Sequence, residues 1–384
     1  MRRLLILAST MVFFDVVFFA AIAPLLPDYV AEFDLSKAEA GILTASYAAG
    51  TLLASLPAGL VATRYGPRRT VIVGLLLLGA ASLAFGFVEQ ILLLDLARFA
   101  QGVAGALIWS GALCWLITTA PSERRGSVIG TALGAAVAGA LFGPALGALA
   151  AEVGTEPVFG AVFGVAFVLA VFAARLPDAK APEEQSLREV AATIGSRPIL
   201  IATSFVAVPS VMFGAVEVLV PLRIDELGGG HGLIAGGFIA GAALEAALAP
   251  LAGRYSDRAG RRTPLVVGLC ICAVAMVLVA MGETLGLLMT ALIATSLGAG
   301  VCFAPALAML SEAAEASSLH QGYAAGLSNM AWASGQVVGG VAGAGVAGAT
   351  GNAIPSFAIS ALLIATAAFA FRWLTPTLPR PAQA

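Results

Sequence analysis

The sequence predicts an all-α membrane protein in which twelve transmembrane helices form two pseudo-symmetric six-helix bundles. Three observations lead to this fold class: an apolar composition, twelve apolar stretches, and a pattern of glycines and arginines that recurs about halfway along the chain. Of the 384 residues, 60% are hydrophobic and 11% are charged, whereas an ordinary soluble domain carries about 25% charged residues. Lipid is therefore expected to be the main solvent of the protein.

The apolar stretches have the length that membrane crossing requires. A helix that spans the hydrocarbon core needs about 20 apolar residues, and the stretches are separated by short polar turns. Twelve such helices use nearly the whole chain and leave little for a soluble domain. Their expected first residues are 4, 39, 70, 90, 127, 157, 198, 232, 264, 286, 322 and 354.

The longest polar segment runs from Leu176 to Arg197 and divides the chain into halves. Its prolines and charged residues cannot bury a core, which is typical of a hydrated linker. We therefore expect an N-terminal six-helix bundle over residues 1–175, a cytoplasmic linker over 176–197 and a C-terminal six-helix bundle over 198–384.

Basic residues are distributed unequally between the two sides of the predicted bundle. With a cytoplasmic N-terminus, 17 of the 20 lysines and arginines fall on the cytoplasmic side, Lys37 and Arg223 fall outside, and Arg98 lies within a helix. Cytoplasmic loops of membrane proteins retain Lys and Arg. We therefore expect both termini to be cytoplasmic and the protein to lie in the plasma (cell inner) membrane.

An internal repeat relates the two halves. One set of glycines recurs 196 positions later, and a set of glycines and arginines recurs 194 positions later. Two parallel halves predict a pseudo-two-fold axis along the membrane normal, with a binding site between the halves near mid-membrane. The matched residues are Gly126, Gly130, Gly139, Gly143 and Gly147 with Gly322, Gly326, Gly335, Gly339 and Gly343, and Gly59, Arg64, Gly66, Arg68 and Gly74 with Gly253, Arg258, Gly260, Arg262 and Gly268.

The repeated loops at 59–69 and 253–262 are candidate conformational elements. Their glycines permit a tight turn and close helix approach, and Asp257 with its neighbouring arginines can form charge-assisted bonds between the halves in one state. The alternative is that the arginines only enforce topology. The candidate residues are Gly59, Arg64, Gly66, Arg68, Gly253, Asp257, Arg258, Gly260 and Arg262.

Three motifs resemble signatures of the major facilitator superfamily. The loop at 253–262 resembles its cytoplasmic signature, although the first copy has Thr63 where the acid is expected. The segment 98–102, Arg-Phe-Ala-Gln-Gly, resembles its second signature. An arginine inside the membrane is costly unless it faces a cavity or a partner, and Asp95, one turn earlier, is the alternative partner for Arg98.

The segment 139–147 resembles the signature of exporters that exchange a substrate for protons. Its glycines at four-residue spacing let another helix approach closely, and Pro144 removes a backbone hydrogen bond, so that the helix can bend. Ordinary small-residue packing is the alternative, because the copy near residue 339 lacks the proline. The candidate hinge residues are Gly139, Gly143, Pro144 and Gly147.

Three acidic residues interrupt the apolar stretches and are candidate proton-coupling or substrate residues together with Arg98. Asp15 lies near the expected bilayer centre, Glu217 toward the outer side and Glu245 toward the inner side. Intramembrane acids are expensive and mark ion or substrate paths, unless they pair locally or face headgroups. Three polar residues spaced three and four apart share one helix face and are expected to line the cavity, or to form an incidental polar stripe: Asn329, Trp332 and Gln336.

The whole chain is identified as a twelve-span member of the major facilitator superfamily, similar to drug:proton antiporters. The stretch from Asp15 to Pro27 resembles that of vesicular amine transporters and their bacterial multidrug relatives. This resemblance implies alternating access, with the first, fourth, seventh and tenth helices lining a cavity. The sequence lacks a phosphate-binding loop and zinc-ligand spacing, so we expect no enzyme activity, no cofactor and no direct use of ATP.

The expected function is therefore proton-coupled efflux of small amphipathic or cationic organic molecules. The expected partners are a small-molecule substrate, protons and the lipid bilayer, without nucleic acid, and we expect a monomer. One alternative is a transporter of a defined metabolite, such as a sugar or an organic acid. A less favoured alternative is a membrane enzyme or a lipid-handling protein.

Overall fold

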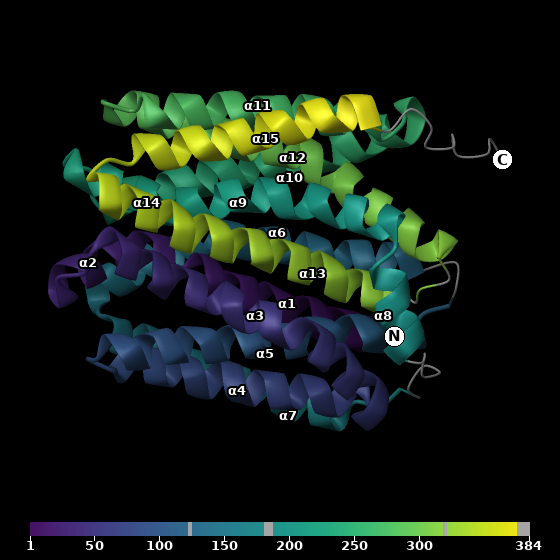
Figure 1. Ribbon diagram of the computed structural model, residues 1–384. Coiled ribbons are helices and arrows are strands. Elements are labelled where there is room, and N and C mark those ends of the chain that lie inside the picture. Colours follow the sequence, from purple (N-terminus) through teal and green to yellow (C-terminus); the bar gives the residue numbers. More distant parts are fainter. Residues whose placement is uncertain (122–124, 180–186, 318, 320, 375–384) are drawn as a thin grey trace.

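The computed structural model describes residues 1–121, 125–179, 187–317, 319 and 321–374, and the chain over these ranges is built from helices without strands (Figure 1). Ten helical stretches in the described chain are long and apolar enough to cross a membrane. They are α1 with α2 (Arg2–Ala20 and Ile22–Phe33), α3 (Lys37–Tyr65), α4 (Pro67–Phe87), α5 (Ile91–Thr119), α6 (Arg125–Val153), α7 (Thr155–Arg175), α9 (Arg197–Glu226), α10 (His231–Ala259), α11 (Arg262–Ala280) and α12 (Leu285–Ala316).

Two further stretches complete the twelve helices that the sequence predicts. The first consists of α13 (Gln321–Val337), the π-helical turn η2 (Val338–Ala342) and α14 (Gly343–Thr350), which follow one another without a gap. The second is α15 (Ile354–Leu374). Every stretch begins within three residues of its predicted start, so the all-α membrane fold is confirmed.

Local signals explain where the helices begin. The Ser36 hydroxyl accepts a hydrogen bond from the Glu39 backbone N–H, and the Glu39 carboxylate accepts one from the Ser36 N–H at 2.8 Å. This capping box fixes the first turn of α3. Pro67 occupies the first turn of α4, where a missing N–H removes no helical bond.

Two segments differ from the prediction. The stretch from Pro24 to Pro27, whose bounding prolines predict an extended segment, is helical and belongs to α2, and only Ala21 separates α2 from α1. Pro24 has no N–H to bond the carbonyl of the preceding turn, so the helix is interrupted at Ala21 and resumes. The predicted linker contains the helix α8 (Leu187–Ile194), although residues 180–186 of that linker lie outside the described chain.

The helices form two groups that lie side by side. Figure 1 shows α3, α4, α5 and α7 on one side and α9, α10, α11, α12 and α15 on the other, with the start of α1 and the end of α15 at the same end of the molecule. Within the first group α3 packs on α5, α4 on α5 and α7, and α1 on α6. Within the second, α11 packs on α12 and α15, and α10 on α12.

The repeated glycines make equivalent contacts in the two groups. A Cβ at Gly139 or Gly143 would lie closer than 3.0 Å to the carbonyl of Phe13 or Val17 on α1, and a Cβ at Gly335 or Gly339 would do the same at Ala207 or Val211 on α9. The contacted carbonyls form corresponding pairs as well: Phe13 and Ala207, and Val17 and Val211, are each 194 residues apart. Close backbone approach of α6 to α1, and of α13–η2 to α9, is thus the structural reason for the repeat.

We expect Gly147→Ala to destabilise the protein, because the new Cβ would overlap the backbone carbonyl of Ala21. Overpacking of this kind costs about 1–3 kcal/mol. The matched control is Gly134→Ala on the same helix, where a Cβ would meet nothing within 4 Å. Thermal unfolding of the purified variants should show a lower midpoint for Gly147→Ala alone, and equal midpoints would contradict this packing.

Candidate functional site

A cavity of about 660 Å³ lies between the two groups of helices. Its lining extends almost to the ends of the helices on the side of the chain termini, where it includes Ile129, Ser311 and Ala324. In the opposite direction the lining stops earlier. Glu217 lies nine residues before the last residue of α9, and Leu292 lies seven residues after the first residue of α12. Seven residues correspond to about 10 Å of helix. The cavity is therefore open toward the termini and closed at the other end.

Helices from both groups contribute to the cavity wall. The family resemblance implies that the first, fourth, seventh and tenth membrane helices line the cavity. These helices are α1, α5, α9 and α12, and all four line it, as do α3, α6, α10 and α13. All three residues of the predicted polar face, Asn329, Trp332 and Gln336, are among the lining residues, as is Pro144 of the predicted hinge.

Three carboxyl groups line the cavity. Asp15 comes from α1, Glu217 from α9 and Glu245 from α10, so the structure brings all three predicted acids to one space. No lysine, arginine or histidine is found among the described lining residues. The only charge that the described lining side chains can carry is therefore negative.

Asp15 is held by two hydrogen-bond donors. The Tyr47 hydroxyl donates to Oδ1 at 2.8 Å, and the Trp109 indole N–H donates to Oδ2 at 3.0 Å. Only 1% of Asp15 is exposed. The sequence analysis did not predict either donor. The only indication in the sequence is weak: Tyr47 and Trp109 each carry a polar atom within an apolar helix, and such an atom needs a hydrogen-bond partner.

The two glutamates have different surroundings. Glu245 makes no hydrogen bond or ion pair with the part of the chain that the structure describes, and its backbone packs against Gly300 of α12. Glu217 lies beside the amide of Gln336. Of the three cavity carboxyls, that of Glu245 is thus the one that no hydrogen-bond donor of the described chain holds in place.

Arg98 lies behind the cavity wall and is 1% exposed. Its guanidinium donates to the carbonyls of Phe18 and Phe19 at 3.1 and 3.4 Å and to Gln101 Oε1 at 3.1 Å. Asp95 does not take the alternative role of its partner, since its buried Oδ1 has no hydrogen-bond partner among the described residues. Arg98 therefore ties α5 to the last turn of α1, next to the interruption at Ala21.

Aromatic rings connect the two groups of helices at the cavity. The Phe19 ring lies 5.1 Å from the Tyr47 ring and 4.9 Å from the Trp332 ring, measured between centroids. Phe213 of α9 and Phe303 of α12 stack at 5.9 Å on the opposite wall. The wall around the acids is therefore mostly apolar and aromatic.

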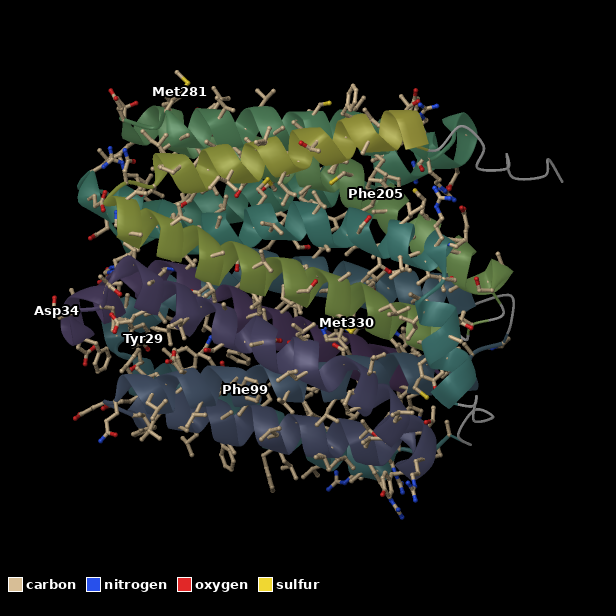
Figure 2. All side chains as sticks on the ribbon, viewed as in Figure 1. Tyr29, Asp34, Phe99, Phe205, Met281 and Met330 are labelled. Carbon is tan, nitrogen blue, oxygen red and sulfur yellow. The ribbon has the colours of Figure 1, made fainter. Side chains whose placement is uncertain are left out.

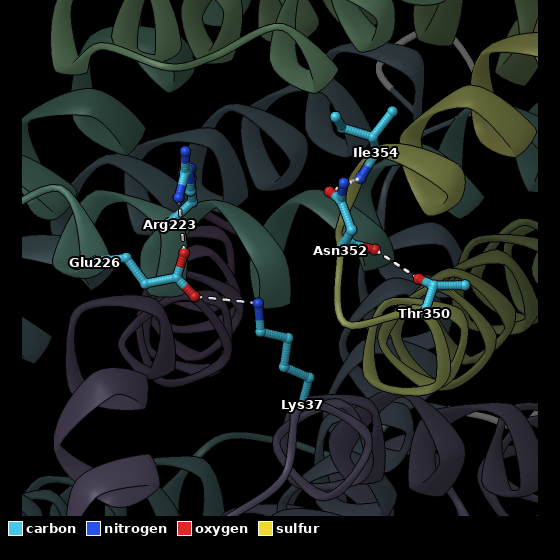
Figure 3. Close-up of polar contacts among 6 residues, drawn as sticks. All are labelled: Lys37, Arg223, Glu226, Thr350, Asn352 and Ile354. Carbon is cyan, nitrogen blue, oxygen red and sulfur yellow. Dashed lines mark hydrogen bonds and ion pairs between the residues drawn. The ribbon is translucent and has the colours of Figure 1, made fainter.

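Polar side-chain contacts close the end of the molecule opposite the termini. Lys37 of α3 pairs with Glu226 of α9 at 3.1 Å, and Arg223 pairs with the same carboxylate at 3.0 Å (Figure 3). Asp28 of α2 and His231 of α10 lie 2.8 Å apart. Each of the contacts made by Lys37 and Asp28 links one half of the chain to the other, so they hold the halves together at this end.

The predicted conformational loops show repeated geometry. Gly66 and Gly260 have φ angles of +91° and +90°, a conformation that favours glycine, which agrees with the predicted tight turns. Close helix approach at Gly59 and Gly253 is not observed, because a Cβ at either would meet nothing within 4 Å. These two residues lie near the open end of the cavity, where the halves are apart.

The charged residues of these loops bond within their own halves or to the start of the linker. Arg68 lies 3.6 Å from Asp178 and donates to the Leu176 carbonyl at 3.1 Å. Arg261 pairs with Asp257 and with Glu312, the latter at 2.7 Å. Asp257 thus bonds within its own half, and the predicted bond between the halves is not observed in the part of the chain that the structure describes. The remaining candidate arginines of these loops are Arg64, whose guanidinium lies 5.7 Å from the Tyr65 ring, Arg258 and Arg262.

Comparisons with known proteins agree on the family. The sequence model described as "Major Facilitator Superfamily" matches residues 8–282 and 232–384. The MFS-type transporter ppzB of Metarhizium rileyi is 32% identical over 124 residues, which is 31% of this chain and 26% of that relative, so the chain spans about a quarter of its length in the match.

Two solved structures have the same fold. A D-xylose-proton symporter matches with a TM-score of 0.78 and 16% identity over 98% of both chains. A bacterial homolog of the human lysosomal transporter Spinster, in an inward-facing and occupied conformation, matches with a TM-score of 0.78 and 14% identity over 97% of this chain and 96% of that chain. With the family match over nearly all residues, this chain belongs to the Major Facilitator Superfamily.

Proposed function

We propose that this protein is a membrane transporter that exports small cationic or amphipathic organic molecules in exchange for protons. The observation that carries the proposal is the cavity whose charged lining consists of Asp15, Glu217 and Glu245, without a basic residue among the described lining. Charges interact strongly in surroundings of low dielectric constant. An organic anion would be repelled by these carboxylates, whereas a cation would be attracted.

The aromatic wall supports the same substrate class. The faces of Trp and Tyr rings attract ammonium groups. Tyr47 and Trp109, which both bond to Asp15, line the cavity together with Trp332. A volume of about 660 Å³ lies within the range of about 300–1,000 Å³ that accommodates drug-sized ligands.

Competition between a proton and a cation for the negative charge of the same acidic cavity provides the coupling. A carboxylate that has taken up a proton no longer attracts the cation, so each ligand lowers the affinity for the other. We assign cation binding to Asp15, because two donors hold it in place. We assign the coupling proton to Glu245, because no hydrogen bond from the described chain fixes its charge.

Alternating access follows if the closed and open ends exchange. With both termini in the cytoplasm of a plasma-membrane protein, the open end faces the cytoplasm and loads substrate for export. The pairs Lys37–Glu226 and Asp28–His231 close the outer end. Opening that end requires these bonds to break, while Asp257 becomes free to bond across the inner end.

Transport of a neutral sugar is the second candidate. Asn329, Gln336 and Thr51 line the cavity and can bond hydroxyl groups, and one solved relative of the same fold is a D-xylose-proton symporter. The acidic lining disfavours the organic-acid alternative.

Purified protein in liposomes with an imposed pH gradient distinguishes these functions. The protein should move tetraphenylphosphonium and aromatic amines against the proton gradient, but neither xylose nor glucuronate. Failure to move any member of a broad cation panel would refute the proposal, and movement of xylose alone would establish the second candidate.

A further inference from the structure

Tyr47 connects Asp15 to a buried positive charge. Its hydroxyl donates to Asp15 Oδ1 at 2.8 Å, and the Arg98 guanidinium carbon lies 5.2 Å from the centroid of its ring. The side chain is nearly buried, with 3% of the residue exposed. It therefore lies between a carboxyl of the cavity and an arginine outside the cavity wall.

The backbone around Tyr47 is also fixed in place. Its carbonyl accepts a hydrogen bond from the Thr51 hydroxyl at 3.1 Å, and it packs against Gly102 of α5, where a Cβ would overlap that carbonyl. The Arg98 donors that reach Phe18, Phe19 and Gln101 hold the guanidinium in position. These contacts therefore hold the Tyr47 ring and the Arg98 guanidinium in a defined position relative to each other.

We propose that Tyr47 is a positioning residue that couples the Arg98 charge to Asp15 and thereby sets the pH range in which Asp15 binds a cation. This inference rests on the proposed export of cations. A hydrogen bond from Tyr47 to the charged carboxylate of Asp15 favours the charged form. The Arg98 guanidinium lies over the face of the Tyr47 ring and is attracted to it. The Trp109 N–H supplies the second donor.

Other charged groups near Asp15 do not replace this contact. Glu217 and Glu245 share the cavity and act in the opposite sense, as like charges. The part of α6 that lines the cavity is apolar, including Val137, Ala140 and Pro144. The remaining acids and arginines of the described elements packed on α1 lie toward the ends of the membrane-crossing stretches: Asp28 and Glu32 on α2, Asp95 on α5, Arg125 and Glu152 on α6, and Glu156 and Arg175 on α7.

Tyr47→Phe tests the proposal, because it keeps the ring and removes only the hydroxyl. The matched control is Tyr29→Phe on α2 (Figure 2), since the Tyr29 hydroxyl is buried and has no hydrogen-bond partner in the described structure. Binding of tetraphenylphosphonium, whose charge does not titrate, is measured from pH 5 to 9 by equilibrium dialysis with purified protein. Thermal unfolding without ligand checks that each variant is folded.

Loss of the donor should move the pH of half-maximal binding upward by about one unit, because a hydrogen bond to a charged group contributes roughly that much. Affinity should fall about tenfold at low pH and less than about threefold at high pH, with Tyr29→Phe unchanged. A Tyr47→Phe midpoint equal to that of Tyr29→Phe, or an equal loss at every pH, would overturn the role of Tyr47. Absence of cation binding by the wild-type protein would instead refute the proposed function.

Discussion

Asp15→Asn is expected to lower the affinity for tetraphenylphosphonium by about 100-fold or more. Removing one partner of a buried charge pair costs about 3–5 kcal/mol, and each 1.4 kcal/mol is about tenfold in affinity. The asparagine side chain has nearly the same size, but its amide carries no charge. Tyr47 and Trp109 now donate to different carboxylate oxygens, and the NH2 group that replaces one of these oxygens cannot accept a hydrogen bond. Equilibrium binding at pH 8 measures the effect.

The control for this substitution is Asp34→Asn. Asp34 is exposed at the closed end of the bundle (Figure 2) and has a φ angle of +51°, a conformation that asparagine tolerates. The control should bind the cation as the wild-type protein does. If Asp15→Asn retained wild-type affinity at this pH, Asp15 would not be the cation site.

Glu245→Gln is expected to separate substrate exchange from proton coupling. The variant should still exchange labelled for unlabelled tetraphenylphosphonium across the liposome membrane, because the Asp15 site is intact. Accumulation driven by a pH gradient should fall at least about tenfold, because a glutamine cannot carry the proton. Both rates are measured on the same liposome preparation.

The matched control is Glu283→Gln, at an exposed position after α11. It should leave exchange and gradient-driven accumulation unchanged. Full gradient-driven accumulation by Glu245→Gln would assign the coupling proton elsewhere. Loss of exchange together with accumulation would show that Glu245 is needed for substrate binding itself.

The helices could be predicted from the sequence because each carries its own signal. Apolar length and polar turns are local, and so the start of α10 at His231, for example, was expected one residue away. Local signals also identified Asp15 and Glu245, since a charge within an apolar stretch is visible without knowing its neighbours. The π-helical turn at η2 has no such local signal, and it was missed. The interruption at Ala21 has a local cause in Pro24, but the same prolines also suit an extended segment, so the helix that resumes after Ala21 was missed.

The contacts around the site could not be predicted in the same way. Tyr47 and Trp109 lie 32 and 94 residues from Asp15, so their bonds exist only after α1, α3 and α5 have packed. The same holds for Lys37 and Glu226, which are 189 residues apart. Asp257 illustrates a different limit, because its motif predicts a bond between the halves, whereas in this structure Asp257 pairs with Arg261 of its own half.

The central claim, that one cavity opens to each side of the membrane in turn, is tested most directly by labelling Asn329→Cys. This position lines the cavity on α13, and the four native cysteines are first replaced. A membrane-impermeant maleimide is applied to each side of sealed vesicles, with and without substrate. The account predicts labelling from the side of the termini in one condition and from the opposite side in the other; labelling from only one side in every condition would contradict it.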